Sequence, residues 1–178
     1  MTLWLLLAAA AFLSFERLCY LHISRAPEHF RRFCQRPAVA SLGEPVEVLQ
    51  KLFYGFKTIQ ITVFLGWCYV HSQGTLWPVG RGVLPLAIGA VLLIVGQLLN
   101  AAVFYRLGTV GVFYGNQLGY HVPWSQDFPF SWLKHPQYVG SVCSIWGFFV
   151  LMRYPHHDWY MLPALETVYY ALGAAFEG

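Results

Sequence analysis

Two acidic residues in the last apolar run of the chain are candidates for chemistry. Glu166, Tyr170, Gly173 and Glu177 are spaced by four, three and four residues, so a helix places them on one face. An ionisable side chain inside a membrane helix costs about 2.5–3.5 kcal/mol on insertion scales, which makes it a functional candidate by default. Two ordinary interpretations stand beside this one. Glu166 can be a buried carboxylate bonded to a neighbouring helix, and Glu177 can be a solvated acid at the helix end.

A second candidate is the junction His135-Pro136, which has Lys134 before it and Tyr138 after it. Proline fits the first turn of a helix, because its missing N–H would be unpaired there in any case. The junction therefore predicts the start of a helix. A histidine at that position can cap the helix or contact a ligand.

Glycines form a third pattern. Gly89, Gly96 and Asn100 are spaced by seven and four residues and share one helix face. The next glycines, at positions 108, 111, 115 and 119, would form a small-residue ridge if that stretch were helical. Glycine allows either close helix packing or close approach of a ligand to the backbone. The pattern alone leaves both interpretations open.

The elements that must position these residues are apolar. Of the 178 residues, 57% are hydrophobic and 11% are charged, whereas about 25% charged residues is usual in soluble domains. Mean hydropathy is +0.50. We predict an all-α integral membrane protein with one domain over residues 1–178, built as a bundle of four to five transmembrane helices. The apolar runs cover residues 3–20, 52–70, 83–105, 138–152 and 159–176, and the last two can pair as a helical hairpin.

Charge distribution gives a topology and excludes some partners. Lys and Arg are dense between the first two runs, nearly absent between the second and third, and return in the polar region 106–136. The positive-inside rule therefore places the first and third loops in the cytosol and the N-terminus outside. A net charge of +3 without a basic tail predicts no nucleic-acid partner. The four cysteines form no CxxC pair and have no metal-ligand spacing with histidine, so we expect no zinc site.

Four sequence elements resemble the phosphatidylethanolamine N-methyltransferase family. They are LGTVGVFYGNQLG (residues 107–119), FPF (128–130), HPQYVGS (135–141) and a terminal AFEG (175–178). The resemblance covers residues 83–178 and extends more weakly to the first half. The glycine-rich element followed by FPF is the most particular to these phospholipid enzymes.

The resemblance implies methyl transfer from S-adenosylmethionine to the amine of phosphatidylethanolamine or of its mono- and dimethyl forms. Family members bind this donor through a Gly-x-Gly in the third membrane segment and an acidic pair at the end of the last one. In this sequence the first element falls on residues 94–96, where only Gly96 matches. The second falls on Glu177 and Gly178, where only the acid matches. His135 and Tyr138 are expected to contact polar parts of the donor.

The remaining roles follow from the implied reaction. Methyl transfer requires proximity, alignment and a neutral amine, but no covalent nucleophile. Glu166 and His135 are candidate proton acceptors, and Arg106 and Lys134 are candidates to bind the lipid phosphate, although each cation can also be a topology anchor. The chain has no βαβ pattern for a Rossmann-like domain, so the donor would bind between membrane helices.

Two alternatives stay open from the sequence. One is a different methyltransferase on the same scaffold, such as one that methylates the carboxyl group of a prenylated cysteine. The other is a non-catalytic membrane relative, which the incomplete Gly-x-Gly and acidic pair favour. A eukaryotic enzyme of this kind is expected in the endoplasmic reticulum or in mitochondria, and a bacterial one in the inner membrane.

Overall fold

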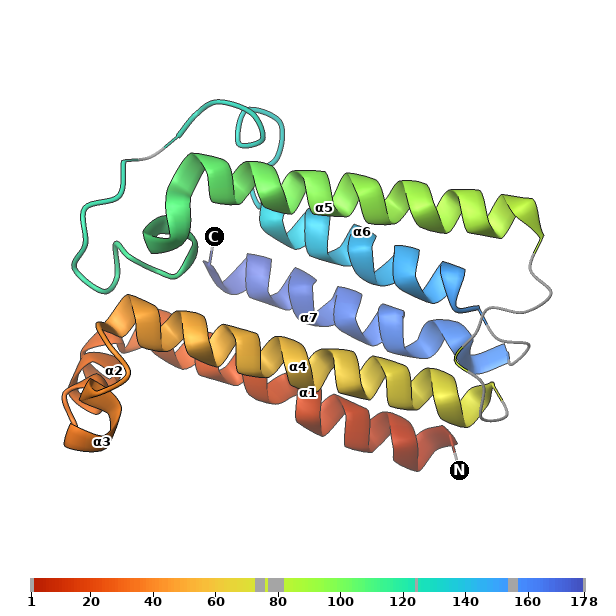
Figure 1. Cartoon of the computed structure of the whole chain (residues 1–178), viewed down its shortest axis with the longest axis horizontal. Helices are drawn as coiled ribbons and strands as arrows, with labels where there is room; N and C mark the ends of the chain where they lie inside the picture. The colour runs from red at the N-terminus through yellow and green to blue at the C-terminus, as the bar shows by residue number, and fades with distance from the viewer. Residues whose placement is uncertain (1, 73–75, 77–81, 124, 154–156, 178) are drawn as a thin grey trace.

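The structure is a computed structural model that describes residues 2–72, 76, 82–123, 125–153 and 157–177. All regular secondary structure in these residues is helical. Five long helices lie side by side and alternate in direction (Figure 1): α1 (Thr2–Arg25), α4 (Pro45–His71), α5 (Val83–Val112), α6 (Pro136–Leu151) and α7 (Met161–Glu177). The short helices α2 (Pro27–Cys34) and α3 (Pro37–Ala40) follow α1, and the 3-10 helix η1 (His157–Tyr160) precedes α7.

One end of the bundle gathers the basic residues, and we call it the basic end. It holds α2, α3, the last turns of α1, α5 and α7 and the first turns of α4 and α6 (Figure 1). Its Lys and Arg residues are Arg25, Arg31, Arg32, Arg36, Lys51, Arg106 and Lys134. Among the described residues, Arg153 is the only Lys or Arg at the opposite end.

Helix α4 begins at Pro45, ahead of the predicted start at residue 52. A capping box explains the difference: the Glu44 side chain accepts from the backbone of the third helical residue, and the Glu44 N–H donates to the Glu47 carboxylate at 3.1 Å. Pro45 occupies the first helical position. Local capping, rather than hydropathy, sets this boundary.

Helix α5 continues past the predicted end at residue 105, through a break at Gly108, and stops at Val112. The glycines that follow form no helical ridge. Gly108 and Gly119 have φ values of 63° and 88°, a conformation that L side chains rarely adopt. The region predicted as a polar loop from residue 106 therefore starts as helix and then turns back over the basic end.

Glycines join α5 tightly to α6. A Cβ added to Gly140 would lie 2.8 Å from the Gly96 carbonyl oxygen, and one added to Gly147 would lie 2.8 Å from that of Gly89. Contacts this short would force the two backbones apart. The face of α5 that carries Gly89 and Gly96 is therefore a packing face, as one interpretation of the spacing predicted.

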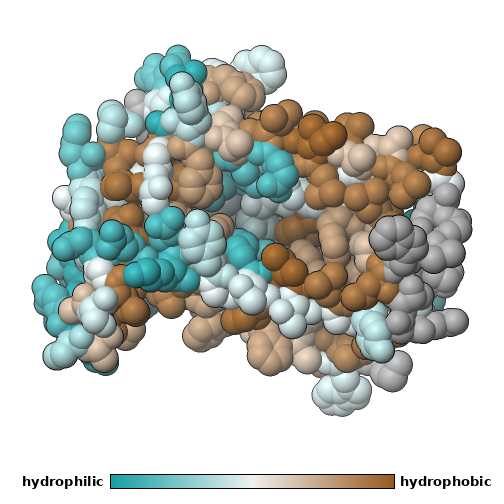
Figure 2. All heavy atoms as spheres, viewed as in Figure 1, coloured by the Kyte–Doolittle hydropathy of each residue, from teal (hydrophilic) through white to brown (hydrophobic). Residues whose placement is uncertain are grey.

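Two of the described helices, α1 and α5, are long and apolar enough to cross a membrane, and α6 is a shorter apolar helix. Large apolar side chains are exposed along α1 and α5, among them Trp4, Phe12, Leu84 and Leu98. Figure 2 shows apolar side chains over much of α5 and hydrophilic ones gathered towards the basic end. Exposed apolar surface of this extent is typical of contact with lipid or with another protein.

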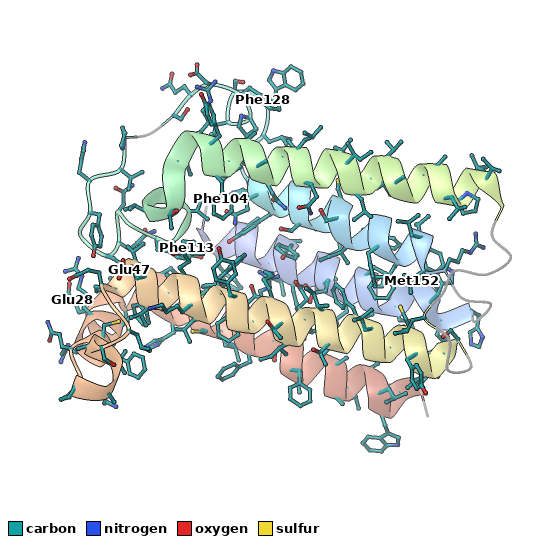
Figure 3. The ribbon with its side chains drawn as sticks, viewed as in Figure 1. Glu28, Glu47, Phe104, Phe113, Phe128 and Met152 are labelled. Carbon is teal, nitrogen blue, oxygen red and sulfur yellow. The ribbon has the colours of Figure 1, made fainter. Side chains whose placement is uncertain are left out.

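The interior is packed in two clusters. One joins α1, α4, α6 and α7 through residues such as Leu13, Phe64, Phe149 and Leu162. The other, which includes Phe113, fills the basic end. Phe104 and Phe113 lie between α5 and α4 there, with ring centroids 6.1 Å apart, whereas Met152 marks the opposite end (Figure 3).

Candidate functional site

A cavity of about 850 Å³ runs from the middle of the bundle to the basic end. All five long helices contribute to its wall, and its volume is in the range of about 300–1,000 Å³ usual for small-ligand sites. Figure 2 shows the surface hollowed between α4 and α5, with hydrophilic side chains beside the hollow. Polar residues from four helices line it: Glu16, Arg17, Lys57, Gln60, Gln97, Asn100, Ser141 and Ser144.

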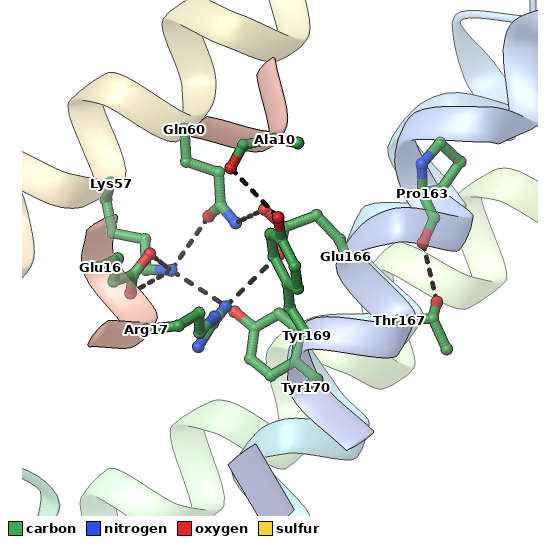
Figure 4. A network of polar contacts seen from close by, with 10 residues as sticks. All are labelled: Ala10, Glu16, Arg17, Lys57, Gln60, Pro163, Glu166, Thr167, Tyr169 and Tyr170. Atoms are coloured by element: carbon green, nitrogen blue, oxygen red, sulfur yellow. Dashed lines mark hydrogen bonds and ion pairs between the residues drawn. The ribbon is translucent and has the colours of Figure 1, made fainter. Parts of the chain in front are cut away.

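A network of charged side chains lies at the inner end of this cavity (Figure 4). Glu16 of α1 pairs with Lys57 of α4 at 3.1 Å, and Arg17 of α1 pairs with Glu166 of α7 at 3.4 Å. Gln60 connects the pairs, since it accepts from Lys57 at 3.0 Å and donates to Glu166 at 3.1 Å. Three helices that are distant in sequence are thereby joined.

Burial explains why these residues are paired. Glu16 is 4% exposed and Glu166 is 1% exposed, so each carboxylate depends on the protein to replace its water. An isolated charge in such a place is strongly unfavourable, whereas two acids and two bases together leave the network neutral. The network is therefore a structural requirement of this bundle as well as a candidate for chemistry.

Aromatic rings extend the network towards the basic end. The Arg17 guanidinium lies 3.8 Å from the centroid of the Tyr170 ring, and Lys57 donates to the Tyr170 hydroxyl at 3.5 Å. The Tyr170 ring meets the edge of Tyr138 at 5.6 Å, and Tyr138 stacks on His135 at 5.7 Å. This aromatic column, Tyr170–Tyr138–His135, lines one wall of the cavity.

Two further lining residues carry buried polar atoms that no described residue satisfies. They are the Tyr20 hydroxyl and the Asn100 Oδ1. A buried polar atom without a hydrogen-bond partner costs about 1–3 kcal/mol. A polar ligand in the cavity could supply these partners.

The start of α6 brings together three residues predicted from the sequence. His135, at the N-cap position, Lys134 and Tyr138 all line the cavity. Arg106, the other predicted phosphate ligand, is not among the lining residues; it pairs with Asp127 at 3.0 Å and donates to the Phe128 carbonyl at 3.1 Å. These two contacts tie the end of α5 to the FPF loop.

Arg25 lines the cavity although no sequence pattern selected it as a site residue. It is exposed at the end of α1, and its guanidinium lies 5.3 Å from the Phe176 ring of α7. Arg25, at the end of α1, and Lys134, in the bend just before α6, are therefore two exposed cations that line the same cavity. The sequence showed Arg25 only as one of several arginines in a basic stretch.

The predicted donor-binding residues lie in different surroundings: Gly96 packs between two helices, whereas the end of α7, next to Glu177, lines the cavity. Gly96 is buried against α6, where an added Cβ would lie 2.5 Å from the Gly140 carbonyl oxygen, and only its neighbour Gln97 lines the cavity. Phe176 lines the cavity, and α7 ends at Glu177. The Glu177 side chain and Gly178 lie outside the described part of the chain.

Glu166 is a buried carboxylate that accepts hydrogen bonds from residues of other helices. This arrangement is one of the two interpretations that its position in the sequence allowed. It is not among the residues that line the cavity. Its partners Arg17 and Gln60, and the pair Glu16–Lys57, were missed as site residues. The signal that selected Glu166, an ionisable group inside an apolar run, also applies to Glu16 and Arg17 in the first run and to Lys57 in the second.

Comparisons with known proteins give a family match. The model of a family described as phospholipid methyltransferase matches residues 84–178. Phosphatidyl-N-methylethanolamine N-methyltransferase of Arabidopsis thaliana is 46% identical over 50 residues, which cover 28% of this chain and 30% of that protein. No solved structure matches the chain.

Proposed function

Because the chain belongs to the phospholipid methyltransferase family, we propose that it methylates the amine of phosphatidylethanolamine, or of its mono- and dimethyl forms, with S-adenosylmethionine as the donor. The observation that carries this proposal is the cavity inside the apolar bundle, which has polar walls and two cations at its mouth. A reaction between a lipid amine and a polar donor needs such a place. Methylation of a prenylated cysteine is the less favoured alternative.

The cavity residues fit the donor. Tyr20 and Asn100 offer unpartnered polar atoms, and His135 and Tyr138 offer aromatic faces and polar groups in the same lining. By resemblance to the family, Glu177 would bind the ammonium group of the donor. When bound, S-adenosylmethionine supplies an electrophilic methyl group on a sulfonium.

The lipid would lie with its phosphate at the mouth, near Arg25 and Lys134. A second, apolar groove of about 190 Å³ runs between α1 and α7 and shares Arg17, Tyr20 and Tyr138 with the cavity. Leu18 and Leu172 line this groove. A lipid whose head group enters the cavity could therefore place an acyl chain in the groove, against residues that a hydrocarbon matches.

The protein's contribution to catalysis is alignment and exclusion of water. An in-line displacement gains most from holding the two reacting atoms in contact, and a covalent nucleophile is not required. The rings of Phe104, Phe113, Tyr138 and Tyr170 surround the cavity and limit the access of water to the amine.

We further propose that residues 1–178 form one domain in which all five long helices cross the membrane. Both halves of the chain build the same cavity, so neither half would complete it alone. Helix α6 has 16 residues and α7 has 17, or about 24–26 Å at 1.5 Å per residue, a little less than a bilayer core of about 30 Å. Local thinning of the bilayer accommodates such a difference.

The test is a methylation assay in nanodiscs that contain phosphatidylethanolamine, with methyl-labelled S-adenosylmethionine and separation of the lipid products. We expect label in mono-, di- or trimethylated lipid, and the pattern shows which steps occur. Arg25→Gln and Lys134→Gln should each raise KM for the lipid about three- to tenfold, because each removes a charge-assisted contact to phosphate. Arg32→Gln, at an exposed site on α2 away from the cavity, is the matched control.

Two results would overturn parts of this proposal. If no lipid is labelled while a verified enzyme of the family labels it under the same conditions, phospholipid methylation is wrong. Label in a prenylated cysteine peptide instead would favour the alternative substrate. If Arg32→Gln raises KM as much as the two mouth variants do, the effect is one of general surface charge, and the assignment of Arg25 and Lys134 falls.

A further inference from the structure

Glu16 is the only carboxylate among the described residues that line the cavity. It projects from α1, in the half of the chain that lies outside the family match. Its side chain is 6% exposed, and Lys57 lies 3.1 Å from one of its oxygens and 3.4 Å from the other. A negative group is thus available to a ligand in the cavity and is balanced by one movable cation.

Glu166 does not share this availability. Gln60 donates to its Oε1 at 3.1 Å and Arg17 donates to its Oε2 at 3.4 Å, so both oxygens are engaged on the far side of the network. Glu166 is also absent from the described lining of the cavity. Of the two buried acids, Glu16 is the one that a ligand can reach.

We propose that Glu16 binds the ammonium group of the lipid substrate and accepts its proton before methyl transfer. This inference rests on the proposed function, because it assumes that a lipid amine enters the cavity. An alkylammonium has a pKa of about 10.4 in water, so the substrate arrives charged and without a free electron pair on nitrogen. A buried carboxylate first attracts that cation and then removes the proton.

Proton transfer to Glu16 precedes methyl transfer. An N–H bond of the ammonium breaks, its proton moves to an oxygen of Glu16, and the electron pair stays on nitrogen. That pair forms the new N–C bond with the methyl carbon of the sulfonium donor. The electrons of the broken C–S bond remain on sulfur, which becomes a neutral thioether.

Lys57 makes the exchange possible, because Glu16 is not its only partner. Its ammonium also contacts the Gln60 oxygen at 3.0 Å and the Tyr170 hydroxyl at 3.5 Å. When the substrate cation reaches Glu16, Lys57 keeps these two contacts. The resting ion pair therefore balances the Glu16 carboxylate without blocking it.

Other titratable groups face Glu16 from several elements, and they bear on its pH dependence. Lys57 comes from α4, Glu166 and Tyr170 come from α7, and Arg17, Cys19 and Tyr20 lie on α1 itself. His135, at the N-cap of α6, and Tyr138 of α6 line the same cavity, while the described part of α5 contributes only the neutral amides Gln97 and Asn100 as polar groups.

The first test measures lipid binding without the donor. Short-chain phosphatidylethanolamine and short-chain phosphatidylglycerol, which lacks an amine, are titrated against wild type, Glu16→Gln and the exposed control Glu28→Gln. Wild type and Glu28→Gln should bind the amine lipid with a Kd roughly tenfold or more below that for phosphatidylglycerol. A charge-assisted hydrogen bond contributes a difference of this size. Glu16→Gln should lose this preference while it binds phosphatidylglycerol unchanged.

The second test is the pH profile of kcat/KM. Without Glu16 the reaction depends on the small fraction of free amine in solution, which rises about tenfold per pH unit below the pKa of the amine. Glu16→Gln should therefore be most impaired near pH 7 and recover steeply towards pH 9, with wild type changing much less. A purely structural role would lower kcat/KM equally at every pH.

The outcomes separate this inference from the proposed function. If wild type methylates lipid and Glu16→Gln keeps both the amine preference and the wild-type pH profile, Glu16 has no such role and the proposed function stands. If wild type prefers amine lipids but labels none, the methylation proposal fails and the ammonium site stands. Should Glu16→Gln fail to fold, Glu16→Gln/Lys57→Met carries the same tests, because it leaves neither buried charge unpaired.

Discussion

The carboxylate of Glu166 is stable inside the bundle because residues of two other helices satisfy its oxygens. Arg17 of α1 supplies the charge, Gln60 of α4 supplies a second donor, and the Tyr170 ring lies under the Arg17 guanidinium. Such a pair is weak evidence of net stability, yet the loss of one partner leaves an uncompensated charge. Stability should therefore depend on the match between the two residues more than on either alone.

Arg17→Met should lower the free energy of unfolding by about 3–5 kcal/mol, because it leaves the Glu166 carboxyl group, whose side chain is 1% exposed, without its cation. The measurement is thermal unfolding of the purified protein in detergent. Arg17→Met/Glu166→Met is the matched control, and its unfolding temperature should return most of the way to the wild-type value. A double variant as unstable as the single one would show that packing, and not charge, explains the loss.

The sequence predicted the local part of the site and missed the part built by distant contacts. Lys134, His135 and Tyr138 lie within one turn of each other, so their spacing was sufficient to place them together. The pair Glu16–Lys57 joins residues on two helices, and no spacing rule encodes which helix faces which. Arg106 and Arg25 are both interfacial arginines in the sequence, and only the fold decides that Arg25 lines the cavity.

Helices α5 and α6 are held together by backbone contact through glycine. Gly89 and Gly96 of α5 face Gly147 and Gly140 of α6, and Gln97 donates to Ser144 across the interface at 2.9 Å. Where lipid surrounds a bundle, close packing of small residues replaces much of the hydrophobic driving force. This interface therefore fixes the wall of the cavity from which Asn100, Ser144 and Tyr138 project.

Gly140→Ala should destabilise the protein by about 1–3 kcal/mol, because the new Cβ would lie 2.8 Å from the Gly96 carbonyl oxygen and the helices must separate. Gly66→Ala on α4 is the matched control, since an added Cβ there meets nothing within 4 Å. It should be neutral or slightly stabilising, in line with the higher helix propensity of alanine. Unfolding temperatures in detergent compare the two, and equal losses would contradict the packing argument.

Hydropathy located the long helices correctly and placed their ends less well. The predicted runs fall within α1, α4 and α5 and largely overlap α6 and α7, because apolar stretches of this length have few alternatives to helix. The ends depend on local chemistry that hydropathy ignores. The capping box at Glu44 extends α4 backwards, and the break at Gly108 lets α5 continue into a region that composition described as loop.

Charge is arranged along the whole bundle rather than within single helices. Seven Lys or Arg residues stand at the basic end, two more are neutralised in the interior network, and Arg153 is alone at the opposite end among the described residues. Loops rich in Lys and Arg stay in the cytosol. The same asymmetry predicts that the cavity mouth, with Arg25 and Lys134, faces the cytosol, where a polar methyl donor would reach it.

Cysteine accessibility tests this orientation and the number of spans together. In a background with the four native cysteines replaced, Leu42→Cys and Gln126→Cys at the basic end should react with an impermeant maleimide only from the cytosolic side. Leu76→Cys and Arg153→Cys should react only from the other side, because an odd number of crossings separates them from the basic end. All four positions are exposed, so burial does not limit the reaction.

The position of residue 153 decides between five spans and three, because α6 and α7 either both cross the membrane or both fail to cross it. If Arg153→Cys is labelled from the side opposite the basic end, α6 and α7 both cross, and the bundle has five spans. If it is protected from both sides while Leu76→Cys is labelled, the α6–α7 pair enters the membrane and returns without crossing. The cavity would still open at the basic end, but the wall that carries Tyr138 of α6 and Tyr170 of α7 would belong to a re-entrant hairpin. Labelling of Leu42→Cys from the outer side would instead reverse the whole topology and remove the cytosolic route for the donor.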